Sequence, residues 1–278
     1  MKYGVALGRL NPAFFTTVAE AADKLGFESV WLPEHLVFTS AMSRSPIPFE
    51  SHPPVPPETP VFDAFSYLSY LAALTKHVRL GTHVFNIGLR HPFVTTRSVH
   101  TLDIISGGRV EFGVGASWLE EEWNAAELDF ATRGARVNEC LDIYKRLSVE
   151  TEVAFAGTHF NFDAVAFEPK PVQRPWPPIL VGGESAAALR RAAQHGDGWI
   201  GMGHTAETAA VQVGRLRTLL AQFGRDADAF QICCGGKVQT RGEAEAFSAA
   251  GVTRLIVAPW RRSPEAVRGL EEFAAAVL

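Results

Sequence analysis

The chain has 278 residues and a mass of 30.3 kDa, and 47% of the residues are apolar while 20% are charged. This balance supports a large apolar core and excludes a chain that is mainly disordered. The net charge is −4, from 26 basic and 30 acidic residues. Because no basic run is long enough to neutralise a phosphate backbone, a nucleic-acid partner is disfavoured. With no linker or internal repeat, we expect one domain over residues 1–278.

Targeting and redox features favour a cytoplasmic protein. The N-terminal apolar run ends at Gly8, which is shorter than the apolar region of a secretory signal peptide. No window approaches the ~18 apolar residues of a membrane-spanning helix. The three cysteines, Cys140, Cys233 and Cys234, form no C-x-x-C pair. We therefore expect reduced thiols, no disulfide framework, no structural zinc and no membrane partner.

Short apolar segments alternate along the chain with longer segments whose apolar residues recur every three or four positions. The expected strands are residues 3–7, 29–32, 79–84, 109–113, 179–182, 198–200, 231–235 and 254–258. Helical stripes follow them, for example Val137, Leu141, Tyr144 and Leu147. Repeated strand-then-helix units predict a parallel sheet covered by helices, and eight such units close into a (β/α)8 TIM barrel. An open doubly wound sheet is the alternative, disfavoured because no G-x-G-x-x-G follows the first strand.

Two proline-rich stretches interrupt this alternation. Seven of the 17 prolines lie within residues 46–60, and five more lie within residues 169–178. Proline cannot occupy a helix interior or a central strand, so we expect insertion loops after the second strand and before the fifth. Residues 157–162 predict a small β-hairpin in the second insertion. The first insertion lies at the carboxyl rim of a barrel, where lids are built; an ordered loop without a role is the alternative.

Polar residues follow the second strand directly. Glu34 and His35 come after the apolar run that ends at Leu32 and Pro33, so in a barrel they would lie at the mouth. A carboxylate beside an imidazole can orient the ring, which can then exchange a proton near neutral pH. A capping pair that fixes the next loop is an equal alternative.

Glycines lie within or at the ends of three further strands. Gly81 inside the third strand indicates a bulge or a close approach to something flat; nearby His83 is interpreted first as a core histidine. Gly113 and Gly115 leave bare backbone beside the hydroxyl of Ser117. The fifth strand ends in Gly182-Gly183 and leads through Ser185 into a helix over residues 186–194. Such a turn can bind an anion at the helix N-terminus, although ordinary tight turns look the same.

The sequence motifs of two other classes of barrel enzyme, metal-dependent hydrolases and serine hydrolases, are absent. The nine histidines include no His-x-His and no His-Glu-x-x-His, so we expect no metal site. A serine hydrolase is disfavoured because no G-x-S-x-G occurs. Two glycine-rich strand ends without a metal motif favour a phosphate-bearing cofactor.

Several segments together resemble the bacterial luciferase-like superfamily, in particular its coenzyme F420-dependent oxidoreductases. These segments are residues 21–31, 33–35, 73–82, 90–93, 101–109, 112–118, 178–183 and 196–199. They span most of the chain, and the match is weaker after about residue 235. The resemblance implies a (β/α)8 barrel with a tricyclic ring in its mouth.

The resemblance also implies roles for individual residues. It places a non-prolyl cis peptide between His83 and Val84 behind the ring, and a ring contact at Asn86. It implies that His35 is the acid/base and that Glu34 contacts the cofactor. The remaining implied cofactor residues line the polar chain (Gly115, Ala116, Ser117 and Glu121) and bind the phosphate (Gly182, Gly183, Ser185 and Ala186).

Three departures from the family pattern concern cofactor identity: Glu34 replaces an aspartate, Ser117 a glycine and Arg97 a lysine. The resemblance to the F420-dependent subgroup nonetheless implies a coenzyme F420-dependent oxidoreductase that transfers a hydride between the deazaflavin ring and a small organic substrate, and it implies a homodimer. A substrate loop over residues 40–60 with Phe38, Ile47, Phe49 and Phe62 favours an apolar or aromatic substrate, unless these side chains only pack on the barrel. The alternatives are an FMN-dependent monooxygenase served by a separate reductase, and a barrel that binds a ligand without catalysis.

Overall fold

A computed structural model of the chain describes residues 1–40 and 56–278. The loop expected to cover the substrate, with Ile47 and Phe49, falls mostly in residues 41–55 and so lies outside the described residues. The two flanking segments, residues 29–40 and 56–74, are described, and they fix where the loop leaves and re-enters the barrel.

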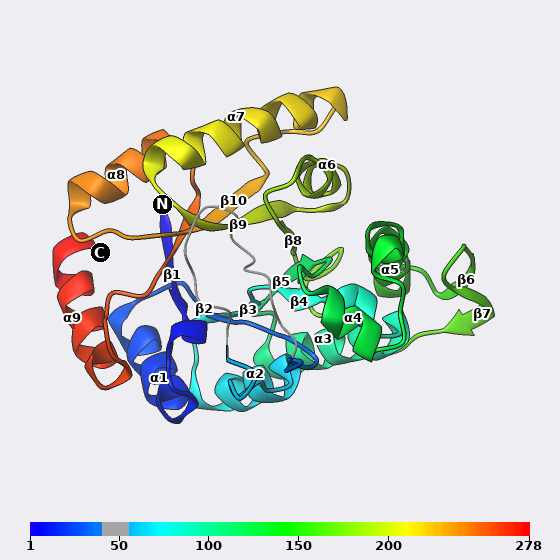
Figure 1. Cartoon of the computed structure of the whole chain (residues 1–278), viewed down its shortest axis with the longest axis horizontal. Helices are drawn as coiled ribbons and strands as arrows, with labels where there is room; N and C mark the ends of the chain where they lie inside the picture. Colours follow the sequence, from blue (N-terminus) through cyan, green and yellow to red (C-terminus); the bar gives the residue numbers. More distant parts are fainter. Residues whose placement is uncertain (41–55) are drawn as a thin grey trace.

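One parallel sheet closes on itself (Figure 1). Its strands are β1 (Lys2–Ala6), β2 (Ser29–Leu32), β3 (Arg79–Thr82), β4 (Phe85–Asn86), β5 (Val110–Gly115), β8 (Ile179–Gly182), β9 (Gly198–His204), β10 (Gln231–Gly236) and β11 (Arg254–Val257). The order is β3-β2-β1-β11-β10-β9-β8-β5-β4, and pairing of β3 with β5 closes the ring. Because β3 and β4 are two parts of one interrupted strand, the expected eight-stranded (β/α)8 barrel is confirmed.

Side chains fill the barrel interior. Trp31, Leu180, Ile200, Cys233 and Ile256 form a buried cluster there. A Cβ at Gly81 would lie 2.3 Å from Trp31 Cε3, and one at Gly4 would lie 2.4 Å from Trp31 Nε1. The flat group expected beside Gly81 is therefore the indole of Trp31, and glycine is needed on two strands to accommodate it.

Helices surround the sheet, as the apolar stripes predict. They are α1 (Phe15–Leu25), α2 (Ala64–Leu74), α3 (Pro92–Ser106), α4 (Glu120–Ala125), α5 (Arg133–Val149), α6 (Ala186–His195), α7 (Ala206–Gln222), α8 (Arg241–Ala249) and α9 (Ala266–Val277). Side-chain caps begin several of them: Asp63 accepts from Ser66 N, and Thr240 and Glu243 form a capping box on α8. None of the helices in residues 1–40 and 56–278 is long and apolar enough to cross a membrane.

The expected hairpin is present before β8. Strands β6 (Glu152–Ala156) and β7 (Asn161–Ala166) pair antiparallel and project away from the barrel (Figure 1). Glu139 on α5 accepts from the backbone N–H groups of Thr158, His159 and Phe160, which holds the turn. The hairpin is longer than residues 157–162 because its strands extend on both sides of this turn.

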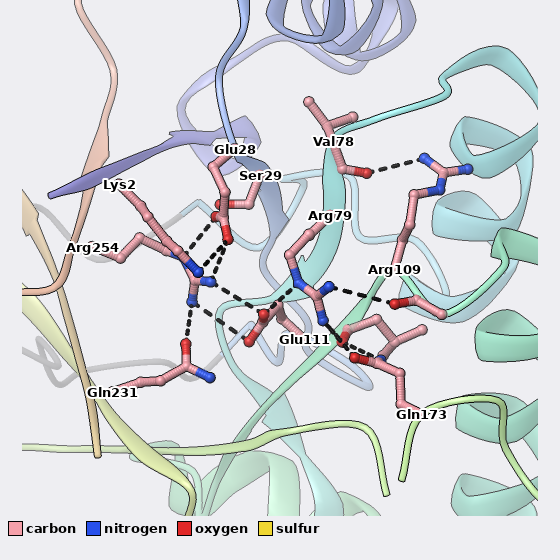
Figure 2. A network of polar contacts seen from close by, with 12 residues as sticks. Lys2, Glu28, Ser29, Val78, Arg79, Arg109, Glu111, Gln173, Gln231 and Arg254 are labelled. Atoms are coloured by element: carbon pink, nitrogen blue, oxygen red, sulfur yellow. Dashed lines mark hydrogen bonds and ion pairs between the residues drawn. The ribbon is translucent and has the colours of Figure 1, made fainter. Parts of the chain in front are cut away.

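A network of charges closes the barrel at the ends where the strands begin (Figure 2). Arg254 on β11 donates to Glu28 at 2.7 and 2.8 Å and to Glu111 at 3.1 Å. Arg79 on β3 also donates to Glu111, and to the side chain of Gln173. Burial by itself lowers the pKa of Arg254. The nearby carboxylates raise this pKa by more than burial lowers it, so the guanidinium stays in its charged form. The opposite, carboxyl end of the barrel is left for a functional site.

Candidate active site

The residues expected to carry chemistry gather at the carboxyl ends of the strands. Glu34 and His35 follow β2, Asn86 ends β4 and Ser117 follows β5. Parallel strands in a closed barrel bring these ends to one rim. Their contacts with one another show which of them form a single site.

His35 lies between a carboxylate and two aromatic rings. Its Nδ1 is 3.2 Å from Glu122 Oε2 and 3.3 Å from Glu122 Oε1. Its ring centroid is 4.7 Å from that of Phe38 and 5.6 Å from that of Trp118, which meets it edge-on. The His35 side chain is 16% exposed, whereas the Glu122 side chain is fully buried. The imidazole is therefore fixed by packing on its faces and by a buried carboxylate on one nitrogen.

Glu122 on α4 joins several strand ends. Its Oε1 accepts from Leu36 N at 2.5 Å. Its Oε2 accepts from Ser117 Oγ at 3.0 Å and from Asn86 Nδ2 at 3.3 Å. These contacts bring His35, Asn86 and Ser117 together, as expected, around a residue that the sequence interpretation did not name.

Glu34 has different partners. Its Oε1 accepts from Arg90 Nη2 at 2.6 Å, and its Oε2 accepts from Asn86 N at 2.9 Å. The carboxylate is buried. The expectation that Glu34 orients the His35 ring is corrected, because that contact belongs to Glu122; contact of Glu34 with a cofactor stays a prediction.

The peptide between His83 and Val84 is cis, as the resemblance implies. The His83 ring meets Trp31 edge-on at 6.3 Å. Burial lowers the pKa of His83 to about 4, against a smaller opposing effect of a hydrogen bond with the Gly201 backbone. His83 is therefore neutral at pH 7, and Val84 next to it packs on the interior cluster that contains Trp31.

The side chain of Val84 leaves no room for a larger residue at two of the glycine positions assigned to cofactor binding. A Cβ at Gly115 would lie 2.6 Å from Val84 Cγ2, and a Cβ at Gly182 would lie 2.8 Å from Val84 Cγ1. Both glycines are buried. Both glycines therefore accommodate the bulge of the third strand; contact of Gly115 or Gly182 with a cofactor stays a prediction.

The turn after β8 has the form that the Gly-Gly pair predicts. Gly183 has a φ of +116°, which favours glycine. Ser185 caps α6 by accepting from Ala188 N at 3.2 Å, and Ser185 and Ala186 are exposed. Exposed amides at a helix N-terminus can bind an anion.

Glu184 in this turn is directed toward β9 and α7. Its carboxylate accepts from Met202 N at 2.8 Å and from Gln212 Nε2 at 3.0 Å, and His204 Nε2 lies 3.2 Å from it. The acid next to the α6 N-terminus is thereby held by three partners on neighbouring elements.

Two other named residues lie at the same rim. Ala116 and Glu121 are partly exposed after β5 and on α4. Their proposed contacts with the polar chain of a cofactor stay predictions. Ser117 has a φ of +63°, a left-handed conformation in which glycine is the easier residue.

The sequence contains a signal for Glu122 that the interpretation did not use. Glu122 and Trp123 on α4 lie three and four positions after Leu119, the N-cap of this helix, and all three are buried. A glutamate on the apolar face of a short helix must find donors inside the fold. Arg90, the partner of Glu34, has no comparable local signal.

A family model, "Luciferase-like monooxygenase", matches residues 4–275. The chain belongs to this family. An uncharacterized protein of Mycobacterium tuberculosis is 27% identical to this family member over 290 aligned positions, which cover 100% of the chain and 99% of that protein. Members of this family are oxidoreductases and monooxygenases, which supports an enzymatic role.

Solved structures share the fold of this luciferase-like chain over 99% of its length. The monooxygenase RslO1 from Streptomyces bottropensis is 23% identical, with a TM-score of 0.77 and 98% of its chain covered. The coenzyme F420-dependent tetrahydromethanopterin reductase from Methanopyrus kandleri is 15% identical, with a TM-score of 0.79 and 98% covered. An F420-dependent secondary alcohol dehydrogenase in complex with an F420–acetone adduct is 16% identical, with the same TM-score and coverage. At these identities the likeness shows the fold alone.

Proposed function

We propose that this luciferase-like protein is a coenzyme F420-dependent oxidoreductase, with His35 as the acid/base. The observation that carries the proposal is the position of His35. Its Nδ1 is held by the buried Glu122, and its ring lies at the carboxyl end of β2, one strand away from the bulge at Val84. A histidine held in this way can exchange a proton with a substrate bound above the barrel.

The residues at the rim fit a planar ring with an anionic tail. Val84 and the interior cluster below it, which includes Leu180 and Ile200, form an apolar floor on which a flat ring can lie. The exposed first turn of α6, at Ser185 and Ala186, offers backbone amides to a phosphate. Gly183 keeps this turn open, since a Cβ there would lie 2.8 Å from Ala188 Cβ.

A bound deazaflavin supplies or accepts a hydride. The chain supplies the proton and the orientation. For reduction of a substrate, His35 would donate a proton to the substrate heteroatom; for oxidation, it would accept that proton. Phe38 and Trp118 beside His35 limit the access of water to the reacting atoms.

The surroundings of His35 support a small apolar or aromatic substrate. Phe38 contacts the His35 ring, and Leu36 and Val37 are exposed at the rim. Phe62, by contrast, packs against Phe15 and Tyr67 at ring distances of 6.4 and 5.4 Å. Phe62 therefore belongs to the packing of α1 and α2, and the support for an apolar substrate comes from residues 36–38.

The second candidate is an FMN-dependent monooxygenase that works with a separate reductase. The apolar rings around His35 favour it as well, because oxygen chemistry on a flavin needs surroundings that exclude water. We prefer hydride and proton transfer because His35 lies at the rim and its Nε2 forms no hydrogen bond within residues 1–40 and 56–278. A cytoplasmic location and the absence of nucleic-acid and membrane partners remain predictions.

Equilibrium binding of the two reduced cofactors to the purified protein distinguishes these functions. We expect micromolar binding of reduced F420, followed by quenching of tryptophan fluorescence, and no binding of reduced FMN under the same anaerobic conditions. The reverse result would establish the monooxygenase instead. Binding of neither cofactor would exclude both.

Turnover is then tested with reduced F420 and a panel of enones, nitroaromatics, imines and alcohols. On any substrate that reacts, His35→Ala should lower kcat by about 10²-fold or more, as expected for loss of a general acid. Unchanged turnover by His35→Ala would remove the acid/base role. Binding of F420 without turnover of any substrate in the panel would favour the ligand-binding barrel.

A further inference from the structure

Every described contact of the Glu122 carboxylate comes from a hydrogen-bond donor or from His35. The backbone N–H of Leu36, the hydroxyl of Ser117 and the amide nitrogen of Asn86 lie 2.5 to 3.3 Å from its oxygens. A carboxylate surrounded by donors accepts at both oxygens. The nitrogen of His35 that faces it, Nδ1, must therefore carry a proton for the contact at 3.2 Å to be favourable.

The second ring nitrogen of His35 has different surroundings. Within residues 1–40 and 56–278, no side chain or backbone group forms a hydrogen bond with Nε2. Phe38 and Trp118 pack against the ring and restrict its rotation. With Nδ1 held toward Glu122, Nε2 is the atom left to meet a substrate.

The two buried carboxylates of the site differ in their charge partners. Glu34 forms an ion pair with Arg90 at 2.6 Å. Across the described part of the chain, the ion pair formed by Glu122 is with His35. Glu122 therefore stabilises the imidazolium that exists after His35 takes a proton, whereas the charge of Glu34 is already neutralised.

We propose that Glu122 is the positioning residue for His35: it fixes the neutral ring as the Nδ1–H tautomer and makes Nε2 the atom that exchanges the proton. In oxidation, the proton passes from the substrate heteroatom to Nε2. In reduction, it passes back from Nε2. Nδ1–H stays with Glu122 in both directions, so the ring need not turn between steps. The direction of the reaction and the catalytic part of this inference rest on the proposed function; the tautomer does not.

Nitrogen NMR of the histidine rings tests the tautomer without any cofactor. In protein with ¹⁵N-labelled histidine, long-range proton–nitrogen spectra distinguish Nδ1–H from Nε2–H rings, and the signal lost in His35→Gln assigns His35. At a pH where the ring is neutral, we expect the Nδ1–H pattern in the unmodified protein. An Nε2–H pattern there would overturn the proposal, and this measurement needs no Glu122 variant to fold.

Substitution of Glu122 tests the cause. In Glu122→Ala the acceptor is lost, and we expect His35 to change to the Nε2–H form or to a mixture. Glu111→Gln is the matched control, because it removes a buried carboxylate at the other end of the barrel. This control should lower stability and leave the His35 signals in place. A His35 tautomer unaffected by Glu122→Ala would show that packing alone sets it.

Kinetics on a proven substrate separate positioning from folding. Glu122→Gln should lower kcat by about 10²-fold with KM nearly unchanged, because the binding residues remain while the charge that stabilises the protonated His35 ring is lost. An equal loss in Glu111→Gln, measured per folded molecule, would contradict the positioning role. If the unmodified protein turns over no substrate, the proposed function fails, while the tautomer measurement still decides the role of Glu122.

Discussion

Arg254 Nη2 lies 3.1 Å from Glu111 Oε1 inside the barrel, and neither side chain is more than 3% exposed. This pair lies where the strands begin, among the other charged side chains of the network (Figure 2). His35 follows the end of β2 and so lies at the opposite, carboxyl rim. Removing one partner of a buried ion pair leaves the other charge without compensation. The stability of the fold therefore depends on charges at one end of the barrel, and the proposed chemistry depends on those at the other.

Arg254→Met should lower the free energy of unfolding by about 3–5 kcal/mol, since Glu111 and Glu28 lose a buried partner. Urea unfolding followed by circular dichroism measures the loss. Arg268→Met is the control, because the Arg268–Glu272 pair on α9 is exposed and such pairs contribute little. Equal stability of the two variants would mean that the buried network does not support the fold.

His100 should make stability sensitive to acid. Burial lowers its pKa to about 4 from an ordinary 6.5, and its Nδ1 lies 3.2 Å from the Pro169 carbonyl oxygen. Between these two pH values the unfolded chain binds a proton at this position and the folded chain does not, so stability falls as the pH drops from 6.5 toward 4. The loss attributable to His100 is up to about 3 kcal/mol, at roughly 1.4 kcal/mol per pKa unit.

Urea unfolding at several pH values checks this dependence. His100→Gln cannot take up the proton, so its stability should fall less steeply than that of the unmodified protein across this pH range. His83, with a pKa also lowered to about 4, contributes with the same sign, so the variant should retain part of the slope. A slope unchanged by His100→Gln would show that this residue is not the source.

Val84 should make Gly182 and Gly115 intolerant of alanine. A new Cβ would lie 2.8 and 2.6 Å, respectively, from the Val84 methyl groups, and such crowding typically costs about 1–3 kcal/mol. Val84→Ala combined with Gly182→Ala should recover part of the loss, because the two changes share one contact. Gly214→Ala on α7, with open space around it, should instead raise stability by up to about 1 kcal/mol. Thermal unfolding compares these variants; additive losses in the double variant would exclude the contact.

The outer face of α2 and α3 should mediate the expected homodimer. Val94 and Ile105 on α3 are 59% and 56% exposed, and Tyr70 on α2 is 54% exposed, which places three of the most exposed large apolar side chains among the described residues on these two helices. Light scattering at micromolar concentration should give a dimer, and Ile105→Lys should give a monomer. Val211→Lys, at an equally exposed position on α7, should leave the dimer intact. A monomeric unmodified protein would refute the expectation.

The order and type of the elements were determined by the sequence itself. Apolar residues at the period of a strand or a helix are a local property, and each strand was found within a few residues of its expected bounds. His35 was located at the rim for the same reason: parallel strands of a barrel end at one side, so a residue directly after β2 lies there. The cis peptide at His83–Val84 came from the resemblance to the family, since no local pattern indicates it.

Which side chains meet at that rim was decided only by the tertiary structure. Glu122 is 87 residues from His35 and Arg90 is 56 residues from Glu34. α4 begins with three consecutive glutamates, which have the same chemistry. Helix periodicity indicates which of these glutamates is buried, but it does not identify the residue that this glutamate contacts. The closing of the barrel and the stagger of its strands select that partner, because they determine which distant side chains are buried together and can satisfy one another's hydrogen bonds.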